Sequence, residues 1–249
     1  EEFIQKHPLL NFQNETILIK GARMFHFEDI AKMLQYKSHE TIMEVDLDAM
    51  VKNLNFYRSR INSSTKLMAM VKAASYGAGT FEIANTLQYN NVDYLTVAYC
   101  DEGVELRRKG ITLPIMVMNP ESGSFEDIIK YNLEPDIYSF RILDVFVDNV
   151  RLLANRRYQI PVHIEIDTGM HRLGFAPEDI PELIARLKRQ TSVIPRSVFS
   201  HLVGSDSTQF DAFTRRQIET FEKASEELQA AFPHKILRHI CNTAGIERY

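Results

Sequence analysis

The sequence predicts an α/β protein whose main domain is a (β/α)8 barrel of the TIM type, and three observations lead to this fold class. Short apolar runs recur from Lys66 to residue 242, near the end of the 249-residue chain. Segments in which apolar residues recur at helical spacing separate these runs. The runs are nearly continuous in apolar residues, as expected of parallel strands covered on both faces. Strands that alternate with helices form βαβ units and a parallel sheet.

The candidate elements follow one another in a regular order. The candidate strands are residues 66–71, 94–100, 114–119, 134–139, 161–167, 196–202 and 237–242. The candidate helices are residues 81–88, 101–110, 124–132, 142–157, 180–190 and 213–232. A doubly wound open sheet is the competing architecture, but the unbroken recurrence of these units favours the barrel. Because seven runs are found where such a barrel needs eight, we predict that it is truncated before its last strand, or that one strand is hidden.

The first 40 residues differ from the rest of the chain. They contain one β-rich run at residues 16–20 and one expected helix at about residues 27–34. One strand and one helix are too little to bury a core alone. We therefore predict a tail or linker over residues 1–40 and the barrel domain over residues 41–249.

Composition excludes several classes of protein. The net charge is −4 with both signs interspersed, which gives no basic surface for nucleic acid. No apolar stretch reaches the length of about 18 residues that a membrane span needs, and the N-terminus does not have the order of a signal peptide. The two cysteines, Cys100 and Cys241, are too few for a disulfide framework or a thiolate metal site. We expect a cytoplasmic protein without a metal ion.

The first polar residue of interest closes the first candidate strand. Lys72 follows an apolar run and precedes small residues with two glycines, Gly77 and Gly79, which permit a tight turn and close approach of a ligand. A buried lysine needs a partner or a chemical use, and a lysine amine can form a Schiff base with an aldehyde. The alternative is a strand-end lysine whose amine reaches solvent.

Charged residues also interrupt the fifth candidate strand. His163, Glu165 and Asp167 share one face by strand alternation, and Arg172 is the nearest candidate partner for these acids. A structural ion pair inside the barrel is the alternative to a functional site.

Two further strand ends carry groups that suit a phosphorylated ligand. His201 ends the sixth run, where a lone histidine is more often a core residue than a functional one. After the seventh run, His239 is followed by Asn242 and Thr243, which can open a helix and so present free N–H groups to a phosphate. An ordinary helix cap is the alternative. Together these strand ends place an amine, an anion–cation pair, a nitrogen base and a candidate phosphate site at one rim, as a phosphorylated aldehyde cofactor requires.

Five segments of the chain resemble alanine racemases, in the correct order. Residues 71–79 (VKAASYGAG) resemble the cofactor motif VKANAYGHG, and residues 166–174 (IDTGMHRLG) resemble VDTGMGRLG. Residues 97–111, 200–202 and 239–244 are similar to further segments of that family. The resemblance covers about residues 41–247 and implies pyridoxal 5'-phosphate as cofactor, alanine as substrate and a homodimer in the full-length protein.

The resemblance also implies a role for each matching residue. Lys72 would carry the cofactor and then act as one of two bases at the alanine Cα. Arg172 would reach the phenolic oxygen of the cofactor and the carboxylate of the substrate. His201 would lie against the pyridine ring.

The remaining matching residues would hold the cofactor at its edges. Tyr76 and Thr243 would bind the phosphate, with Thr243 in place of the usual serine. Asn242 would line the phosphate loop, and His239 would support an arginine that faces the ring nitrogen.

Among the departures of this sequence from the family pattern, those at Glu165, Ala74 and Ala78 bear on the site. Glu165 stands where the family often has a carbamylated lysine, and we infer that this glutamate supplies the anion for Arg172 directly. Ala74 and Ala78 replace an asparagine and a histidine of the cofactor motif, and neither change removes a group with an assigned chemical role.

The expected eighth strand and C-terminal β domain, with the opposite-face tyrosine base, find no match before Tyr249. We therefore expect these residues alone to be inactive as a racemase. Residues 16–23 resemble the end of a Mur ligase, which suggests a ligase–racemase fusion of peptidoglycan synthesis. A non-catalytic pyridoxal-phosphate carrier, a decarboxylase of the same fold and an inactive structural module remain alternatives.

Overall fold

The computed structural model describes residues 16–20, 30, 43–153 and 159–249. The chain divides into two compact units, Glu1–Glu44 and Val45–Tyr249. None of the helices in the described part of the chain has the length and apolar character needed to cross a membrane.

The second unit is built on one parallel sheet of seven strands, which lie side by side in chain order. The strands are β1 Met68–Met70, β2 Tyr94–Val97, β3 Ile115–Val117, β4 Glu134–Ile137, β5 Ile160–Glu165, β6 Val193–Phe199 and β7 Leu237–His239. Each lies within or overlaps one of the seven predicted runs, so the strand predictions are confirmed. In a doubly wound sheet the strand order reverses at a switch point, whereas here it never does, so the barrel-type topology is confirmed. Among the described strands β1 and β7 do not pair with each other, and the sheet is open between them.

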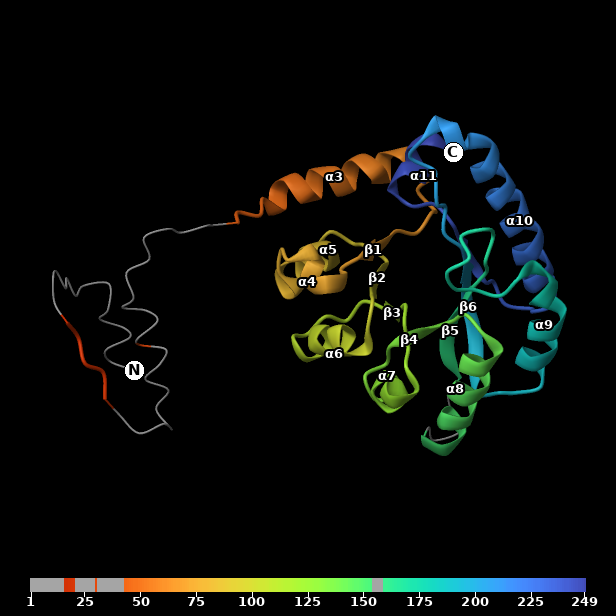
Figure 1. Cartoon of the computed structure of the whole chain (residues 1–249), viewed down its shortest axis with the longest axis horizontal. Helices are drawn as coiled ribbons and strands as arrows, with labels where there is room; N and C mark the ends of the chain where they lie inside the picture. Colours follow the sequence, from red (N-terminus) through yellow and green to blue (C-terminus); the bar gives the residue numbers. More distant parts are fainter. Residues whose placement is uncertain (1–15, 21–29, 31–42, 154–158) are drawn as a thin grey trace. The chain divides into compact units, whose positions relative to one another are not determined.

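The helices lie around the outside of the strands, and Figure 1 shows α5 to α10 following one another in chain order. They are α3 Leu47–Arg60, α4 Lys72–Tyr76, α5 Thr80–Tyr89, α6 Cys100–Arg108, α7 Phe125–Lys130, α8 Phe140–Leu153, α9 Ile180–Lys188, α10 Asp211–Ala230 and α11 Thr243–Arg248. Short 3-10 turns at Ser122–Ser124, Pro177–Asp179 and Thr208–Phe210 precede α7, α9 and α10. The six predicted helices are confirmed, except that residues 154–157 of the fourth lie outside the described residues. Helix α3 was not predicted; none of its residues is fully buried, but Leu47, Met50 and Leu54 recur at helical spacing and pack against the core.

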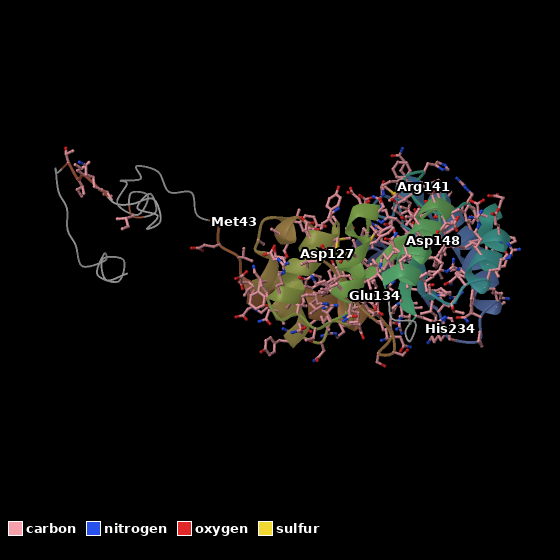
Figure 2. The ribbon with its side chains drawn as sticks, turned by 90° about the horizontal axis from the view of Figure 1, so that it is seen from below. Met43, Asp127, Glu134, Arg141, Asp148 and His234 are labelled. Atoms are coloured by element: carbon pink, nitrogen blue, oxygen red, sulfur yellow. The ribbon has the colours of Figure 1, made fainter. Side chains whose placement is uncertain are left out.

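The strands explain why the apolar runs are continuous. Every residue of β2 and of β3 is buried, because helices cover one face and the interior of the sheet covers the other. From β4 onward several inward positions are polar, and hydrogen bonds join Glu134, His163 and Ser197 there. Glu134 is the first residue of β4 and is labelled in Figure 2. The interior of this half of the sheet is therefore where partners for buried charges must be found.

The first unit bears on two predictions. The strand predicted at residues 16–20 is wrong, since these described residues adopt no strand and four of the five are exposed. No strand among the described residues pairs with this run, and β propensity alone does not hold a run extended. The helix predicted at about residues 27–34 lies outside the described residues except for Ile30, which is helical. Residues 21–23 of the Mur-ligase-like segment also lie outside them.

Candidate active site

Lys72 leads into a left-handed turn directly after β1. The next four residues, Ala73 to Tyr76, all have positive φ, between 51° and 58°, although none is a glycine. Left-handed helical geometry costs an L-residue about 1–2 kcal/mol and normally occurs at single positions. Strain of this kind collects at functional sites, where surrounding contacts hold it in place. The strained turn therefore indicates a functional site at the end of β1, where the conformation of the backbone is kept at a cost in the stability of the fold.

Hydrogen bonds from three directions hold the turn. The N–H of Val71 donates to the Thr96 carbonyl on β2 at 2.9 Å, and the N–H of Ser75 donates back to the Val71 carbonyl at 3.1 Å. Glu102 of α6 accepts from the N–H of Ala73 with one carboxylate oxygen. Its other oxygen accepts from Ala98 at 2.8 Å and Tyr99 at 3.1 Å. Glu102 thus ties the residue after Lys72 to the neighbouring strand end.

Arg172 lies on the loop that follows β5. Asp167 organises the loop, since its Oδ1 accepts from the N–H groups of Gly169 at 2.9 Å and His171 at 3.0 Å. Its Oδ2 lies 2.9 Å from His171 Nδ1. Burial alone would raise the pKa of Asp167, but the hydrogen bonds from His171 and Gly169 outweigh it, and the pKa is lowered. Asp167 is therefore an ionised loop organiser, and Arg172 itself is exposed at the surface of this loop.

His201 provides the observation that joins these elements. Burial lowers the pKa of His201, and the positive charges of Arg172 and Lys72 lower it further. Both cations therefore lie within electrostatic range of the imidazole. The three residues follow β1, β5 and β6, whose carboxyl ends share one edge of the parallel sheet.

Gln217 of α10 sets the position of the His201 backbone. Its Nε2 donates to the His201 carbonyl at 3.0 Å and to Thr168 Oγ1 at 3.1 Å, while its Oε1 accepts from the N–H of Val203 at 3.2 Å. This fully buried amide connects the β5 loop to the end of β6. It was not a predicted site residue, because a lone glutamine in a helix carries no sequence signal.

His239 closes a chain of hydrogen bonds that crosses the interior from β4 to β7. Glu134 Oε2 lies 2.9 Å from His163 Nε2, and His163 Nδ1 lies 2.6 Å from Ser197 Oγ. Ser197 Oγ lies 3.1 Å from His239 Nε2. The His239 ring stacks on Phe199 with centroids 5.1 Å apart. Burial and, to a smaller extent, the nearby His163 lower the pKa of His239 to about 3.

The lowered pKa of His239 predicts a loss of stability in acid. The unfolded chain binds a proton at this histidine near its ordinary pKa of about 6.5, whereas the folded chain does not until about pH 3. Stability contributed by the neutral ring is therefore present above pH 6.5 and is lost as the pH falls towards 3. We expect the free energy of unfolding to fall by about 2 kcal/mol between pH 7 and pH 5 on this account. Urea unfolding at the two pH values measures it.

A matched pair of variants assigns that loss to His239. His239→Gln should show a smaller fall between the two pH values. His234→Gln, which changes a histidine whose Nε2 bonds to the Pro195 carbonyl, should retain the fall of the parent. Equal falls in the parent and in His239→Gln would contradict the buried neutral ring.

Of the three residues predicted at the phosphate, Asn242 is held by hydrogen bonds, whereas Thr243 and Tyr76 are exposed. Asn242 caps α11, since its Oδ1 accepts from the N–H of Gly245 at 2.9 Å and its Nδ2 donates to the Leu202 carbonyl at 2.9 Å. The side chain of Asn242 therefore acts as an ordinary helix cap, which was the alternative to a phosphate ligand. Thr243 at the first position of α11 is exposed, and so is Tyr76, with 67% of its surface accessible.

Glu165 and Arg172 do not form the expected ion pair. Glu165 is 3% exposed, and its Oε2 has no hydrogen-bond donor while the neighbouring carboxyl groups are ionised, whereas Arg172 is exposed. Burial raises the pKa of Glu165, and Arg172 acts on it in the opposite direction. The two groups therefore interact electrostatically without forming an ion pair.

Comparisons with known proteins agree with this geometry. The sequence matches the family described as "Alanine racemase, N-terminal domain" over residues 45–249. Alanine racemase 1 of Oceanobacillus iheyensis is 30% identical over 205 residues, which are 82% of this chain and 54% of that protein. The alanine racemase structure from Clostridium difficile 630 gives a TM-score of 0.75 at 31% identity, over 83% of this chain and 55% of that one.

A more distant structure adds a likeness in fold alone. The alanine racemase of Bartonella henselae, described "with covalently bound pyridoxal phosphate", gives a TM-score of 0.70 at 21% identity, over 81% of this chain and 56% of that one. The chain spans about half the length of the curated relatives that it matches.

Proposed function

The chain belongs to the alanine racemase N-terminal domain family, and from this premise we propose that it binds pyridoxal 5'-phosphate through Lys72 and takes part in the interconversion of L- and D-alanine. The proposal is supported by the position of Lys72, Arg172 and His201 after the carboxyl ends of β1, β5 and β6, where the charges of Lys72 and Arg172 both act on His201. In barrels of this type, chemistry is performed at that end of the strands.

The residues present suit this cofactor. The Lys72 side chain is half-buried, and no hydrogen bond or ion pair to its amine is found among the residues that the structure describes. A primary amine in that setting is available to condense with an aldehyde. The exposed hydroxyl groups of Tyr76 and Thr243 are our candidates for the phosphate, as the resemblance implies.

When bound, pyridoxal phosphate makes the Cα proton of an amino acid acidic because its conjugated ring takes up the charge left behind. We assign the Lys72 amine to remove or return that proton on one face of Cα. The Arg172 guanidinium would bind the substrate carboxylate, for which its planar donors are suited. His201 would lie beside the ring as a neutral imidazole, since its lowered pKa keeps it uncharged at neutral pH.

Trapping the cofactor on the protein tests this proposal. The chain is mixed with pyridoxal phosphate and reduced with borohydride, which fixes a lysine–cofactor bond. Peptide mass mapping should find the added mass on the peptide that contains Lys72. An added mass spread over surface lysines, with none at Lys72, would reject the site.

Arg172 should control the affinity for the substrate carboxylate. In the cofactor-loaded protein, we expect Arg172→Ala to weaken the binding of L-alanine by about 1.5–3 kcal/mol, because a hydrogen-bonded charge partner is lost. Titration with L-alanine, followed by the change in cofactor absorbance, gives the dissociation constant.

A control isolates this effect from a general change of charge. Arg189→Ala removes an exposed arginine just after α9 and should leave the constant unchanged. Equal affinities in Arg172→Ala and the parent would assign the carboxylate to another group.

Several finer statements stay predictions. Racemisation needs a base on the opposite face of Cα, which the resemblance assigns to a tyrosine of a C-terminal β domain in a partner subunit. We therefore propose that activity needs that domain and a homodimer, in the cytoplasm and in the service of peptidoglycan synthesis. A non-catalytic carrier of the cofactor is the alternative function. It would trap the cofactor at Lys72 but would give no absorbance change with L-alanine.

A further inference from the structure

A second buried carboxyl group, which the proposed function does not use, lies beside Glu165. Asp136 on β4 has no exposed surface, and neither of its carboxylate oxygens has a hydrogen-bond partner when the group is counted as ionised. An unpaired ionised carboxylate inside a protein is among the most costly groups to bury. Its place in the fold therefore calls for an explanation.

The sheet register explains why the two acids meet. Asp136 lies opposite His163 on the neighbouring strand, and Glu165 follows two residues later on the same face of β5. The two carboxyl groups lie within hydrogen-bond reach of each other. Two ionised carboxylates are both acceptors only, so no hydrogen bond can form between them unless one holds a proton.

We propose that Asp136 is a positioning residue for Arg172: its protonated carboxyl donates a hydrogen bond to Glu165, and the pair presents one negative charge to the guanidinium. One charge matches the single charge of Arg172, whereas two would add repulsion between neighbouring buried anions. The part of this inference that concerns Arg172 and the substrate rests on the proposed function. The shared proton does not.

The surroundings support the same assignment. Burial raises the pKa of Asp136 well above its ordinary range, and the charge of Glu165 raises it further. Burial also raises the pKa of Glu165, but there Arg172 and the hydrogen bond to Asp136 oppose the rise. Asp136 is therefore the member of the pair that keeps the proton.

The charged and titratable groups around the pair come from three parts of the fold. Arg172 and Asp167 act from the loop after β5, and His163 lies opposite Asp136 on β5. Tyr138 follows β4, and both acids of the pair contribute to the raised pKa of its hydroxyl, after burial. Arg172 is the cation that acts on both acids of the pair.

Infrared spectroscopy of the cofactor-free chain tests the shared proton directly. With aspartate labelled by 13C, the parent should show the C=O stretch of a protonated carboxyl at neutral pH, shifted by the label. The band should be absent from Asp136→Asn and unchanged in Asp127→Asn, which alters an exposed carboxylate of α7. If the parent shows no such band at neutral pH, the proposal is overturned, whether or not any variant folds.

The positioning role is tested with the cofactor-loaded protein. Asparagine keeps the shape and a hydrogen-bond donor but cannot ionise, so Asp136→Asn should bind L-alanine within about threefold of the parent. Glu165→Leu removes the remaining negative charge and should weaken binding by about tenfold or more. A tenfold loss in Asp136→Asn would mean that an ionised aspartate is required and would overturn the assignment.

The two measurements fail independently. If the infrared band of the protonated aspartate is present but the protein does not bind the cofactor, the shared proton is retained and the proposed function is rejected. Cofactor trapping at Lys72 without the band would keep the proposed function and reject this inference.

Discussion

Lys72→Ala is expected to lose the absorbance band of the lysine-bound cofactor completely. The band arises from the C=N bond that joins a lysine nitrogen to the aldehyde carbon and extends the conjugation of the ring. Lys72 follows β1 at the carboxyl end of the sheet, and the positive charge of its amine acts on His201. Loss of the band is an all-or-none change, because no neighbouring side chain can replace a primary amine in this bond. Absorbance spectra of the parent and variant after mixing with pyridoxal phosphate measure it.

Two further variants separate loss of the amine from loss of charge or of fold. Lys72→Arg retains the positive charge but not the nucleophile, and it should also lack the band. Lys66→Ala removes an exposed lysine just before β1, whose amine lies 3.7 Å from Asp93, and it should keep the band. Surface pairs of this kind contribute about 0–1 kcal/mol, so this control should remain folded. A band that persists in Lys72→Ala would place the cofactor on another lysine.

The sequence was sufficient to predict the sheet. Strands such as Tyr94–Val97 and Ile115–Val117 are buried on both faces, so they appear in the sequence as unbroken apolar runs that no surface element would contain. Helix α8, whose buried residues include Ile142, Phe146 and Val150, was predicted because those residues recur at helical spacing. Helix α3 was missed although Leu47, Met50 and Leu54 recur at helical spacing and pack, partly buried, against the core, so a signal for it was present in the sequence.

The sequence could not predict the geometry of the site. The residue types at positions 73–76 do not indicate four left-handed residues, since that conformation depends on hydrogen bonds to Thr96 of β2 and Glu102 of α6. Asp136 was part of a predicted strand, yet its role depends on which residues of the neighbouring strand lie beside it. Strand register joins residues 27 or more positions apart here, and a single sequence does not contain it. A buried aspartate inside an apolar run was the signal that could have pointed to it.

The expected pair of Glu165 and Arg172 failed for a related reason. Strand alternation placed Glu165 on the interior face correctly, as its 3% exposure confirms. The position of Arg172 depends on the loop from Asp167 to Phe175, whose path is set by backbone hydrogen bonds and not by side-chain periodicity. The acid therefore finds its nearest partner in Asp136, across the strand, and not in the arginine that follows it in the chain.

Gly174→Ala is expected to destabilise the protein by about 3 kcal/mol or more, because this glycine closes the Arg172 loop onto β5. Its φ of +114° is rarely adopted by L-residues, and a Cβ there would lie 2.5 Å from the Asp167 nitrogen and 2.8 Å from the Ile166 carbonyl carbon. Both contacts are with backbone, so relief requires breaking the 2.9 Å bonds that Phe175 makes to Glu165 and Asp167. Two alanine variants separate the causes in urea unfolding. Gly110→Ala has φ +94° with nothing within 4 Å and should cost about 1–2 kcal/mol. Gly123→Ala has open space and no unusual φ, and it should change stability by less than about 0.5 kcal/mol. If Gly174→Ala costs no more than Gly110→Ala, the close backbone approach does not hold the loop, and Arg172 must be positioned by other contacts.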